Sequence, residues 1–520
     1  MDSSQAPLMA DNREGDDAEA EEDNVQQGRL TKDVDANPGV FVVALTIAAG
    51  ISGLLFGCVI SATLVSIGTS LSNRELTSMD KSVITSSTSL FALLISPFSS
   101  VLADRLGRKR VVLYADILFI LGAVLQAICS TVPVMIAGRC IIGAGIGAAS
   151  FVVPLYIAEL APASHRGRLV TATVLFITLG QMVAYVVGWA FSAYGSKETG
   201  WRWMVGLGAL PAGFQAAIVV FMPETPRWLV KAGKPAQAKT IIQRVNGGAG
   251  TVEDASAIIK EIEIEIREEE NLGRRRDQQS TRWKWLGAWR DLFGEGKNQR
   301  ALAIACLLQG LQQLCGFMTQ NSLMYFSATI FTAVGFSSPT LTSLTVAITN
   351  FVFTLVALGL VDRIGRRRVL LYSIPFMILG LVCTAVGFSF LLSGVTNSQT
   401  QPQSESGSQW AAYVILISIM LYVASYGIGL GNVPWMQSEL FPLSVRSLGS
   451  GIATATNWSA NFIIGLTFLP LMDALSPSWT FVLYALVCGI GYALVWQIYP
   501  ETAGLSLEEA TALLERGWGV

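Results

Sequence analysis

The sequence is poor in the side chains that carry out chemistry in soluble proteins. Its 520 residues include a single histidine, His165, and only 14% of them are charged, against about a quarter in a soluble domain. The seven cysteines lie in or beside apolar runs and form no CxxC pair or metal-ligand spacing. They are expected to be buried thiols. These absences argue against an enzyme, a metal site and a bound cofactor.

Apolar residues, by contrast, make up 52% of the chain and gather in long runs. A run of about 20 such residues spans the roughly 30 Å of hydrocarbon in a bilayer. Twelve windows of this kind lie at 40–66, 82–103, 111–130, 134–158, 169–193, 203–221, 301–333, 341–361, 369–393, 411–436, 448–471 and 479–499. The expected fold is an all-α polytopic membrane protein with twelve transmembrane helices.

A short cationic motif occurs twice, as Asp104-Arg-Leu-Gly-Arg-Lys-Arg110 and as Asp362-Arg-Ile-Gly-Arg-Arg-Arg368, each time between two apolar windows. Such a charge cluster cannot enter hydrocarbon, because each charged residue costs several kcal/mol there. Each copy is therefore expected to form a tight turn between two helices on the same side of the membrane. Its recurrence predicts two equivalent halves.

The distribution of Lys and Arg predicts the orientation. Thirty of the 35 lie in the segments that are inside the cell if the N-terminus is inside, and four lie in the outer connections. Arg139 falls within the fourth window. By the positive-inside rule, both termini are expected in the cytoplasm.

The duplication divides the chain into five regions. Residues 1–37 hold eleven acidic residues against three basic ones and are expected to be a disordered cytoplasmic tail. The other regions are an N-terminal six-helix bundle, a cytoplasmic linker with short helices at Lys234 to Val245 and Ala255 to Glu270, a C-terminal bundle and a cytoplasmic tail. Their ranges are 38–221, 222–300, 301–499 and 500–520.

A second pair of motifs follows each turn by two helices: Glu159 to Arg166-Gly167, and Glu439 to Arg446. Acids and bases at these positions can close one side of the membrane and separate when it opens. The alternative is a set of static surface ion pairs, worth at most about 1 kcal/mol each. The matching positions favour gating by Asp104, Arg108, Glu159, Arg166, Asp362, Arg366, Glu439 and Arg446.

Taken together, these motifs resemble the sugar porter family of the major facilitator superfamily. The matching segments are the two turns, Glu159 to Gly167, Pro223 to Leu229, Glu439 to Arg446 and Pro500 to Gly504. The resemblance implies the major facilitator fold, with two pseudo-symmetric six-helix bundles around a central site that is reached alternately from each side. It also implies transport of a sugar or polyol.

The amides within the apolar windows support this implication, because neutral amides offer both donors and acceptors to hydroxyl groups. The alternative is that they only join neighbouring helices, at about 0.6 kcal/mol each. By position, the family's substrate contacts correspond to Gln181, Gln312, Gln313, Asn350, Trp435 and Asn457, with Asn321 and Trp458 as further candidates.

Three segments are most similar to fungal myo-inositol transporters: Asn321 to Phe326, Gly429 to Trp435 and Ala453 to Trp458. Hexose carriers usually have Gln where this chain has Asn457. The expected substrate is myo-inositol or a similar cyclic polyol.

Two departures from the family concern the mechanism. The first window lacks the aspartate that carries the proton in coupled members, whereas the partner arginine is matched by Arg139. Asp116 is the candidate replacement; the alternative is that its side chain simply reaches toward the cytoplasm. If Asp116 carries the proton, the chain is a proton symporter. If no carboxylate does, the chain is a facilitator that only equilibrates its substrate. In the seventh window, Met318-Thr-Gln320 separate the glutamines from Asn321, which turns Asn321 by roughly 60° on an ideal helix.

The alternatives are a facilitative hexose carrier, a transporter-like nutrient sensor and a metabolite exporter. A sensor usually needs a long signalling tail, and only about twenty residues follow the twelfth window. The expected location is the plasma membrane, with a small polyol or sugar, protons and bilayer lipid as partners and no nucleic acid.

Overall fold

The computed structural model describes residues 40–59, 67, 71–161, 166–196, 199–245, 255–260, 262–264, 266–267, 286–315, 339–397, 405–442, 445–503, 507–515 and 517–518. Within these ranges, eleven helices are long and apolar enough to cross a membrane. The expected tail at 1–37 and the second part of the seventh window, with Asn321, lie outside the described residues.

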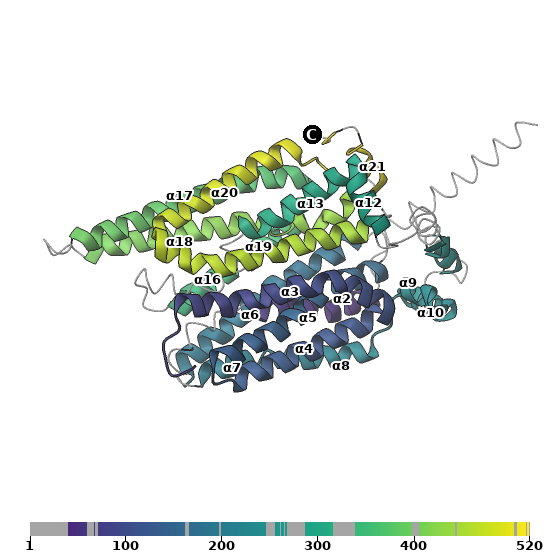
Figure 1. The fold of residues 1–520 in the computed structure, drawn as a ribbon, viewed down its shortest axis with the longest axis horizontal. Helices are drawn as coiled ribbons and strands as arrows, with labels where there is room; N and C mark the ends of the chain where they lie inside the picture. Colours follow the sequence, from purple (N-terminus) through teal and green to yellow (C-terminus); the bar gives the residue numbers. More distant parts are fainter. Residues whose placement is uncertain are drawn as a thin grey trace, which may run out of the picture.

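The N-terminal half is a bundle of long helices (Figure 1). They are α2 (Val40–Val59), α3 (Ser78–Leu106), α4 (Arg108–Ile128), α5 (Val132–Leu160), α6 (Arg166–Tyr194), α7 (Gly200–Gly206) and α8 (Ala209–Phe221). The sixth expected span is thus two helices in line, interrupted between Gly206 and Ala209.

The C-terminal half repeats this arrangement (Figure 1). It contains α13 (Gly296–Leu314), α16 (Pro339–Ile364), α17 (Arg366–Asn397), α18 (Glu405–Ile428), the 3-10 helix η3 (Val433–Leu440), α19 (Arg446–Leu475) and α20 (Pro477–Ile498). The tenth expected span is not one continuous helix: α18 ends at Ile428, and Pro434 stands at the start of η3. Gly429 lies so close to Ser373 that a side chain has no room there.

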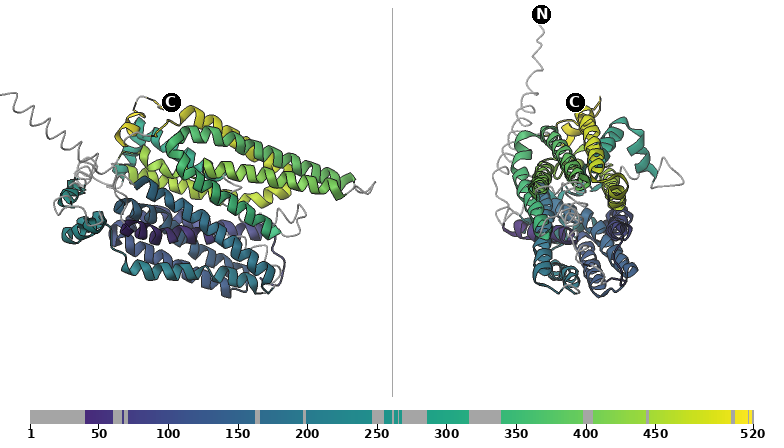
Figure 2. Two further views of the ribbon diagram at one scale, coloured as in Figure 1. Left: turned by 180° about the vertical axis from the view of Figure 1, so that it is seen from behind. Right: turned by 90° about the vertical axis from the view of Figure 1, so that its left-hand side faces the viewer.

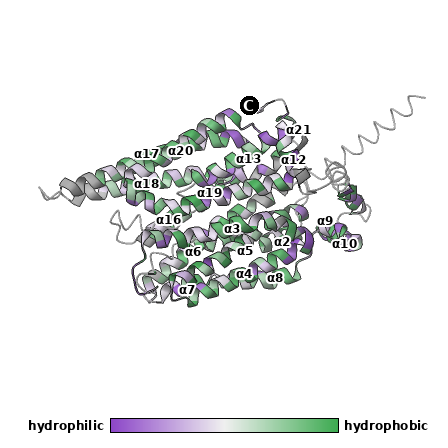
Figure 3. Cartoon of the chain, viewed as in Figure 1, coloured by the Kyte–Doolittle hydropathy of each residue, from purple (hydrophilic) through white to green (hydrophobic). Residues whose placement is uncertain are grey.

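The two halves lie side by side, one above the other in Figure 1 and again in the turned views of Figure 2. They meet where α3 packs along α19 and α6 along α16. The helices of both halves are largely hydrophobic (Figure 3). Many of their large apolar side chains face outward; Leu121, Phe214 and Ile490, for example, are 55–63% exposed. A surface of this kind suits lipid and not water.

Both cationic turns consist of a single glycine between two long helices. Gly107 joins α3 to α4 with φ 95°, and Gly365 joins α16 to α17 with φ 102°. Only glycine adopts such angles without strain. The two turns lie at one end of the molecule, here called the arginine-rich end. The short helices α9 (Pro226–Lys231), α10 (Pro235–Val245), α12 (Leu286–Gly294) and α21 (Leu507–Ala512) lie at the same end (Figure 1).

The linker helix expected from Lys234 to Val245 is present as α10. Of the second linker helix, residues 255–260, 262–264 and 266–267 are described and are helical. Ala255 and Ile259 pack against Ile242 of α10. The linker therefore has a small apolar core of its own.

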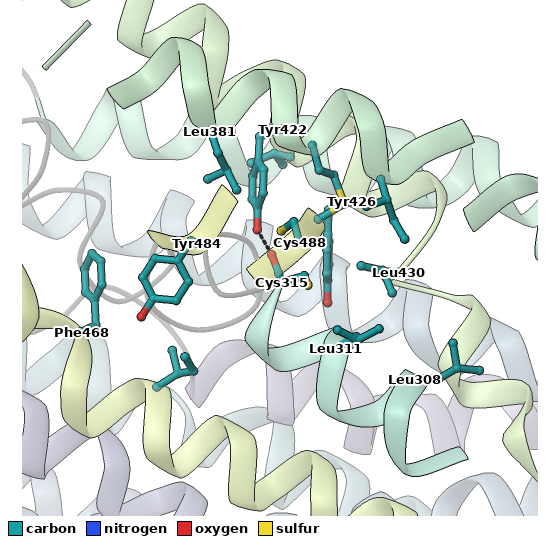
Figure 4. Close-up of a cluster of buried hydrophobic side chains, with 14 of the residues drawn as sticks. Leu308, Leu311, Cys315, Leu381, Tyr422, Tyr426, Leu430, Phe468, Tyr484 and Cys488 are labelled. Carbon is teal, nitrogen blue, oxygen red and sulfur yellow. Dashed lines mark hydrogen bonds between the residues drawn. The ribbon is translucent and has the colours of Figure 1, made fainter. Parts of the chain in front are cut away.

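The C-terminal half encloses an aromatic core (Figure 4). The Tyr422 hydroxyl donates to the Cys315 carbonyl, and the Tyr426 hydroxyl donates to the Gln312 carbonyl at 3.4 Å. Both bonds hold the last turn of α13 against α18. The position of the glutamines on that turn is thus set before the chain reaches the three additional residues at 318–320.

Candidate functional site

A network of amides lies in the middle of the C-terminal half, between α13 and α19. The Asn457 Nδ2 atom donates to Gln309 Oε1 at 2.6 Å and to Gln312 Oε1 at 2.8 Å. Gln313 Nε2 donates in turn to Asn457 Oδ1 at 3.1 Å. All four side chains are at most 4% exposed. The structure therefore unites three glutamines of one helix with Asn457 of another.

The unwound segment between α18 and η3 lies against this network. Gln312 Nε2 donates to the Gly431 carbonyl at 3.1 Å, and Gln309 Nε2 donates to the Pro434 carbonyl at 3.0 Å. These carbonyls are available because the backbone between Gly429 and Pro434 is not in an α-helix. The next residue, Trp435, is thereby fixed beside the amides.

Two contacts connect the halves at the same depth. Asn350 Nδ2 of α16 donates to Gln181 Oε1 of α6 at 3.1 Å. Trp458 of α19 meets Phe56 of α2 edge to face, with ring centroids 5.5 Å apart. Trp458 is 3% exposed and belongs to the apolar core of the N-terminal half. Both halves thus contribute to the centre.

Several buried polar atoms here have no hydrogen-bond partner in the described part of the protein. They are the donors Gln181 Nε2 and Trp435 Nε1 and the acceptors Gln437 Oε1 and Asn432 Oδ1. A buried polar group without a partner costs roughly 1 to 3 kcal/mol, so these atoms are available to bind a polar molecule. Donors, acceptors and aromatic faces together suit a compact molecule that carries many hydroxyl groups.

The structure thus brings together Gln181, Gln312, Gln313, Asn350, Trp435, Asn457 and Trp458, all of which were expected in the site. It adds Gln309 and Gln437. Gln309 was detectable in principle, because Gln309 and Gln313 are four residues apart and share a face of the helix. Gln437 carried no such signal, because its place depends on the 3-10 geometry of η3.

A charge cluster surrounds the Gly107 turn at the arginine-rich end. The Arg108 guanidinium contacts Glu159 Oε1 at 2.8 Å and Asp104 Oδ1 at 3.1 Å. The Glu224 Oε1 atom accepts from the backbone N–H groups of Arg108, Lys109 and Thr225, at 3.0 to 3.2 Å. Burial raises the pKa of the Glu224 carboxyl, and these donors partly offset the rise.

An equivalent cluster surrounds Gly365. Glu501 accepts from the backbone N–H groups of Arg366 and Ala503 through Oε1, and from those of Arg367 and Arg368 through Oε2. A Cβ atom at Gly365 would lie 2.5 Å from the Glu501 carboxylate. The motifs that follow the sixth and the twelfth span therefore hold the two turns in the same way.

The gating residues whose side chains are described make contacts within their own half. Arg108 and Glu159 both belong to the N-terminal bundle, whereas Arg366 and Arg446 donate to the carbonyls of Thr502 and Phe441 in the C-terminal bundle. The side chains of Arg166, Asp362 and Glu439 lie outside the described residues. Each described contact secures a bundle and does not link the two bundles.

Asp116 and Arg139 are both buried, at 0% and 3% exposure, but the structure does not bring them together. A Cβ on Gly145 of α5 would lie 3.1 Å from the carbonyl oxygen of Ala115, which places Asp116 level with Gly145. Arg139 lies six residues away on α5, about 9 Å along the axis. Neither carboxylate oxygen of Asp116 has a hydrogen-bond partner in the described chain. Asp116 therefore does not replace the missing aspartate as the partner of Arg139.

Comparison with known proteins completes this description. A family model described as sugar (and other) transporter matches residues 29–514. The chain is 45% identical to myo-inositol transporter 1 of Cryptococcus neoformans, over 92% of this chain and 82% of the relative. It is 41% identical to myo-inositol transporter 1 of Candida albicans, over 94% and 85%.

Solved structures of the xylose transporter XylE from E. coli are similar to the whole molecule. A partially occluded inward-open form has a TM-score of 0.69 and 25% identity, and the match covers 89% of this chain and 99% of that one. The proton:xylose symporter XylE bound to 6-bromo-6-deoxy-D-glucose has the same TM-score at 26% identity, over 91% and 99%. The major facilitator fold expected from the motifs is confirmed.

Proposed function

Because the chain belongs to the sugar transporter family, we propose that it carries myo-inositol or a closely similar cyclic polyol across the membrane by alternating access. The main observation in favour is the Asn457 network, in which three glutamines already occupy the amide of one asparagine. A polyol hydroxyl both donates and accepts, so it can replace any of these partners without leaving an amide unsatisfied.

The unpartnered atoms around the network supply the remaining contacts. Gln181 Nε2 and Trp435 Nε1 donate to hydroxyl oxygens, and Gln437 Oε1 accepts from a hydroxyl. The aromatic face of Trp435 covers the C–H side of the ring. Gln181 and Asn350 come from different halves, so a bound ring replaces one of the contacts that hold the halves together.

The described hydrogen bonds between the halves lie at the centre and toward the end opposite the arginine-rich end. Besides the Gln181–Asn350 pair, the Ser89 hydroxyl of α3 donates to Asn461 Oδ1 of α19 at 2.6 Å. Asn461 lies one turn beyond Asn457 toward that opposite end. In our proposal the two halves pivot about this contact. The Arg108 and Arg366 clusters keep each half rigid at the arginine-rich end. When the site opens to the other end, these clusters close the arginine-rich end together with Arg166, Asp362, Glu439 and Arg446.

We place the arginine-rich end in the cytoplasm, with both termini there, and the protein in the plasma membrane. The Lys and Arg distribution supports this orientation. So do the surface helices α9, α10, α12 and α21, which lie at that end together with the cationic turns.

Uptake of labelled myo-inositol, measured in cells that lack their own inositol and hexose carriers, tests the proposal. We expect saturable uptake that unlabelled myo-inositol suppresses and glucose suppresses weakly. Stronger suppression by glucose would identify a hexose carrier. The absence of polyol and hexose uptake, with the protein present at the cell surface, would refute transport and favour a sensor.

A further inference from the structure

A buried carboxylate remains outside the proposed inositol site. Asp116 on α4 is 0% exposed, and neither of its oxygens has a hydrogen-bond partner in the described chain. An ionised carboxylate in such a place is strongly disfavoured, because it loses its hydration and gains no compensating contact. A protonated carboxyl is tolerated there if its O–H finds an acceptor.

The packing of α4 against α8 supplies that acceptor. The two helices are antiparallel, since Lys109 Nζ donates to the Val220 carbonyl at one end of the contact. One turn further, Val112 and Val219 line the same small cavity. The next turn on this face of α4 presents Asp116, and the next on α8 presents Gln215.

Gln215 is half satisfied. It is 0% exposed, and its Nε2 donates to Ser52 Oγ at 2.6 Å and to the Ala48 carbonyl at 3.2 Å, both on α2. Its Oε1 has no partner in the described residues. This register puts an acceptor without a donor on α8 level with a carboxyl that becomes a donor when it binds a proton. The two unpartnered groups are complementary only in the protonated state.

A small cavity lies one turn from Asp116, toward the arginine-rich end. The cavity between α2, α4, α5 and α8 is lined by Ala49, Lys109, Val112, Tyr156, Val219 and Met222 and measures about 10 Å³, roughly the space of one water molecule. The other titratable or charged groups on these four helices are Cys58 on α2, Arg108, Lys109, Arg110 and Tyr114 on α4, and Arg139, Cys140, Tyr156 and Glu159 on α5. Of these, Lys109 and Tyr156 line the cavity, and Arg139 lies about two turns from Asp116.

Helix α2 connects this cluster to the inositol site. Ser52 lies one turn before Phe56, whose ring contacts Trp458. At the next residue, Gly57, a Cβ atom would lie 2.7 Å from the backbone nitrogen of Gln181. A shift of α2 that follows a change in the Ser52–Gln215 bond therefore reaches two residues of the central site.

We propose that Asp116, together with Gln215 and Ser52, is the proton-binding site of the transporter, and that one proton bound to the Asp116 carboxylate accompanies each substrate molecule. This inference rests on the proposed transport of myo-inositol. The proton binds a carboxylate oxygen in one state of the transport cycle, and in the other it leaves through the cavity to the arginine-rich end, so that no other chemical bond changes.

The test uses the full-length protein in liposomes and measures counterflow and accumulation separately. Counterflow exchanges labelled for unlabelled myo-inositol without a gradient. With one proton per substrate, a gradient of one pH unit sustains at most about tenfold accumulation. We expect wild-type protein to approach this value and Asp116→Asn to equilibrate at a ratio of about one while it still exchanges inositol. Asp473→Asn, which removes an exposed carboxylate of α19, is the matched control and should accumulate like wild type.

The outcomes separate the two proposals. Loss of counterflow in wild-type protein would refute the proposed function itself. Two results would overturn the proton site and leave the proposed transport intact. In the first, the wild-type protein shows counterflow but no accumulation. In the second, Asp116→Asn accumulates inositol as strongly as wild type. If Asp116→Asn does not fold, Gln215→Leu provides the test. This variant removes the acceptor of the protonated carboxyl, so the pH profile of its accumulation should lie roughly one unit more acidic than that of wild type. An unchanged profile would overturn the proposal.

Discussion

The two halves of the molecule are alike at the arginine-rich end and different in the middle. At the end, Gly107 with Glu224 and Gly365 with Glu501 form the same turn in the same way. In the middle, the C-terminal half carries the amide network, whereas the N-terminal half carries the buried charges Asp116 and Arg139. The two halves thus share one way of folding their turns but differ in the polar groups that they bury in the middle.

The difference has a physical basis. A turn between two membrane helices must place cations at the surface and satisfy the first N–H groups of the following helix, and a glutamate behind a glycine does both. This requirement is the same in each half. A polyol, however, offers different groups to each side of the site, and a proton needs only one carboxylate.

The largest effect is expected at the centre of the C-terminal half. Asn457→Ala removes the amide shared by three glutamines and should lower the initial rate of inositol uptake about 100-fold, since two hydrogen bonds at roughly 1.4 kcal/mol each are lost. Gln126→Ala is the control, because Gln126 is a buried amide of α4 outside the site. Normal uptake by Asn457→Ala at wild-type surface expression would show that the network is only structural.

The equivalence of the two turns predicts equal damage. Gly107→Ala and Gly365→Ala force a side chain into a positive-φ position and against a carboxylate, and each should cost about 3 kcal/mol or more of stability. Gly233→Ala is the control: Gly233 also has a positive φ, 74°, but a Cβ atom there would meet no other atom within 4 Å. Only the backbone angle is strained, and a loss of about 1 to 2 kcal/mol of stability is expected. Thermal unfolding in detergent measures the stability of all three variants. Clearly unequal losses of stability at Gly107 and Gly365 would show that the two turns are not equivalent.

The glutamates behind the turns should differ slightly. Glu501 uses both carboxylate oxygens, whereas all three backbone bonds of Glu224 reach Oε1. Glu501→Gln replaces one accepting oxygen by an NH₂ group and should cost about 1 to 3 kcal/mol. Glu224→Gln keeps its bonds and should cost less than about 1 kcal/mol. Equal melting temperatures for the two variants would show that this asymmetry has no energetic weight.

The smallest effect concerns pH. Burial raises the pKa of Glu224 above its ordinary value, so ionisation of this carboxyl is less favourable in the folded than in the unfolded protein. Its destabilising effect is complete above the raised pKa and disappears as pH falls through it toward the unfolded value. Wild-type protein should therefore gain stability relative to Glu224→Gln as pH is lowered from neutral. A relative loss in parallel melting curves would contradict the sign.

Sequence reasoning performed well where hydrocarbon imposes the answer. Eight of the twelve apolar windows match a described helix to within four residues at each end, because backbone groups in lipid must be satisfied within each segment. Sequence reasoning did not predict the breaks within two of the spans, because these depend on how the chain packs against neighbouring helices. The window at 411–436 contains a break that positions Trp435 and Gln437, and the window at 203–221 begins with the separate helix α7.

Pairing between distant residues was equally hard to foresee. Asp116 and Arg139 are the ionisable residues inside neighbouring windows, and proximity in sequence favoured their pairing. The antiparallel packing of α4 and α5 places them about 9 Å apart along the helix axis. The group that we propose as the partner of Asp116, Gln215, is almost 100 residues away and shows no motif.

By itself, the sequence determined the membrane-spanning helices, the duplication and the placement of both cationic turns at one end, since each follows from the cost of moving charge and bare backbone into hydrocarbon. The sequence also named most amides of the proposed site, because these lie inside apolar runs and match the family's positions. The tertiary structure decided which amides share one asparagine, which polar atoms remain unpartnered in the described residues and which helices pack around Asp116. These depend on the rotation and register of packed helices, and a difference of one residue turns a side chain by about 100°.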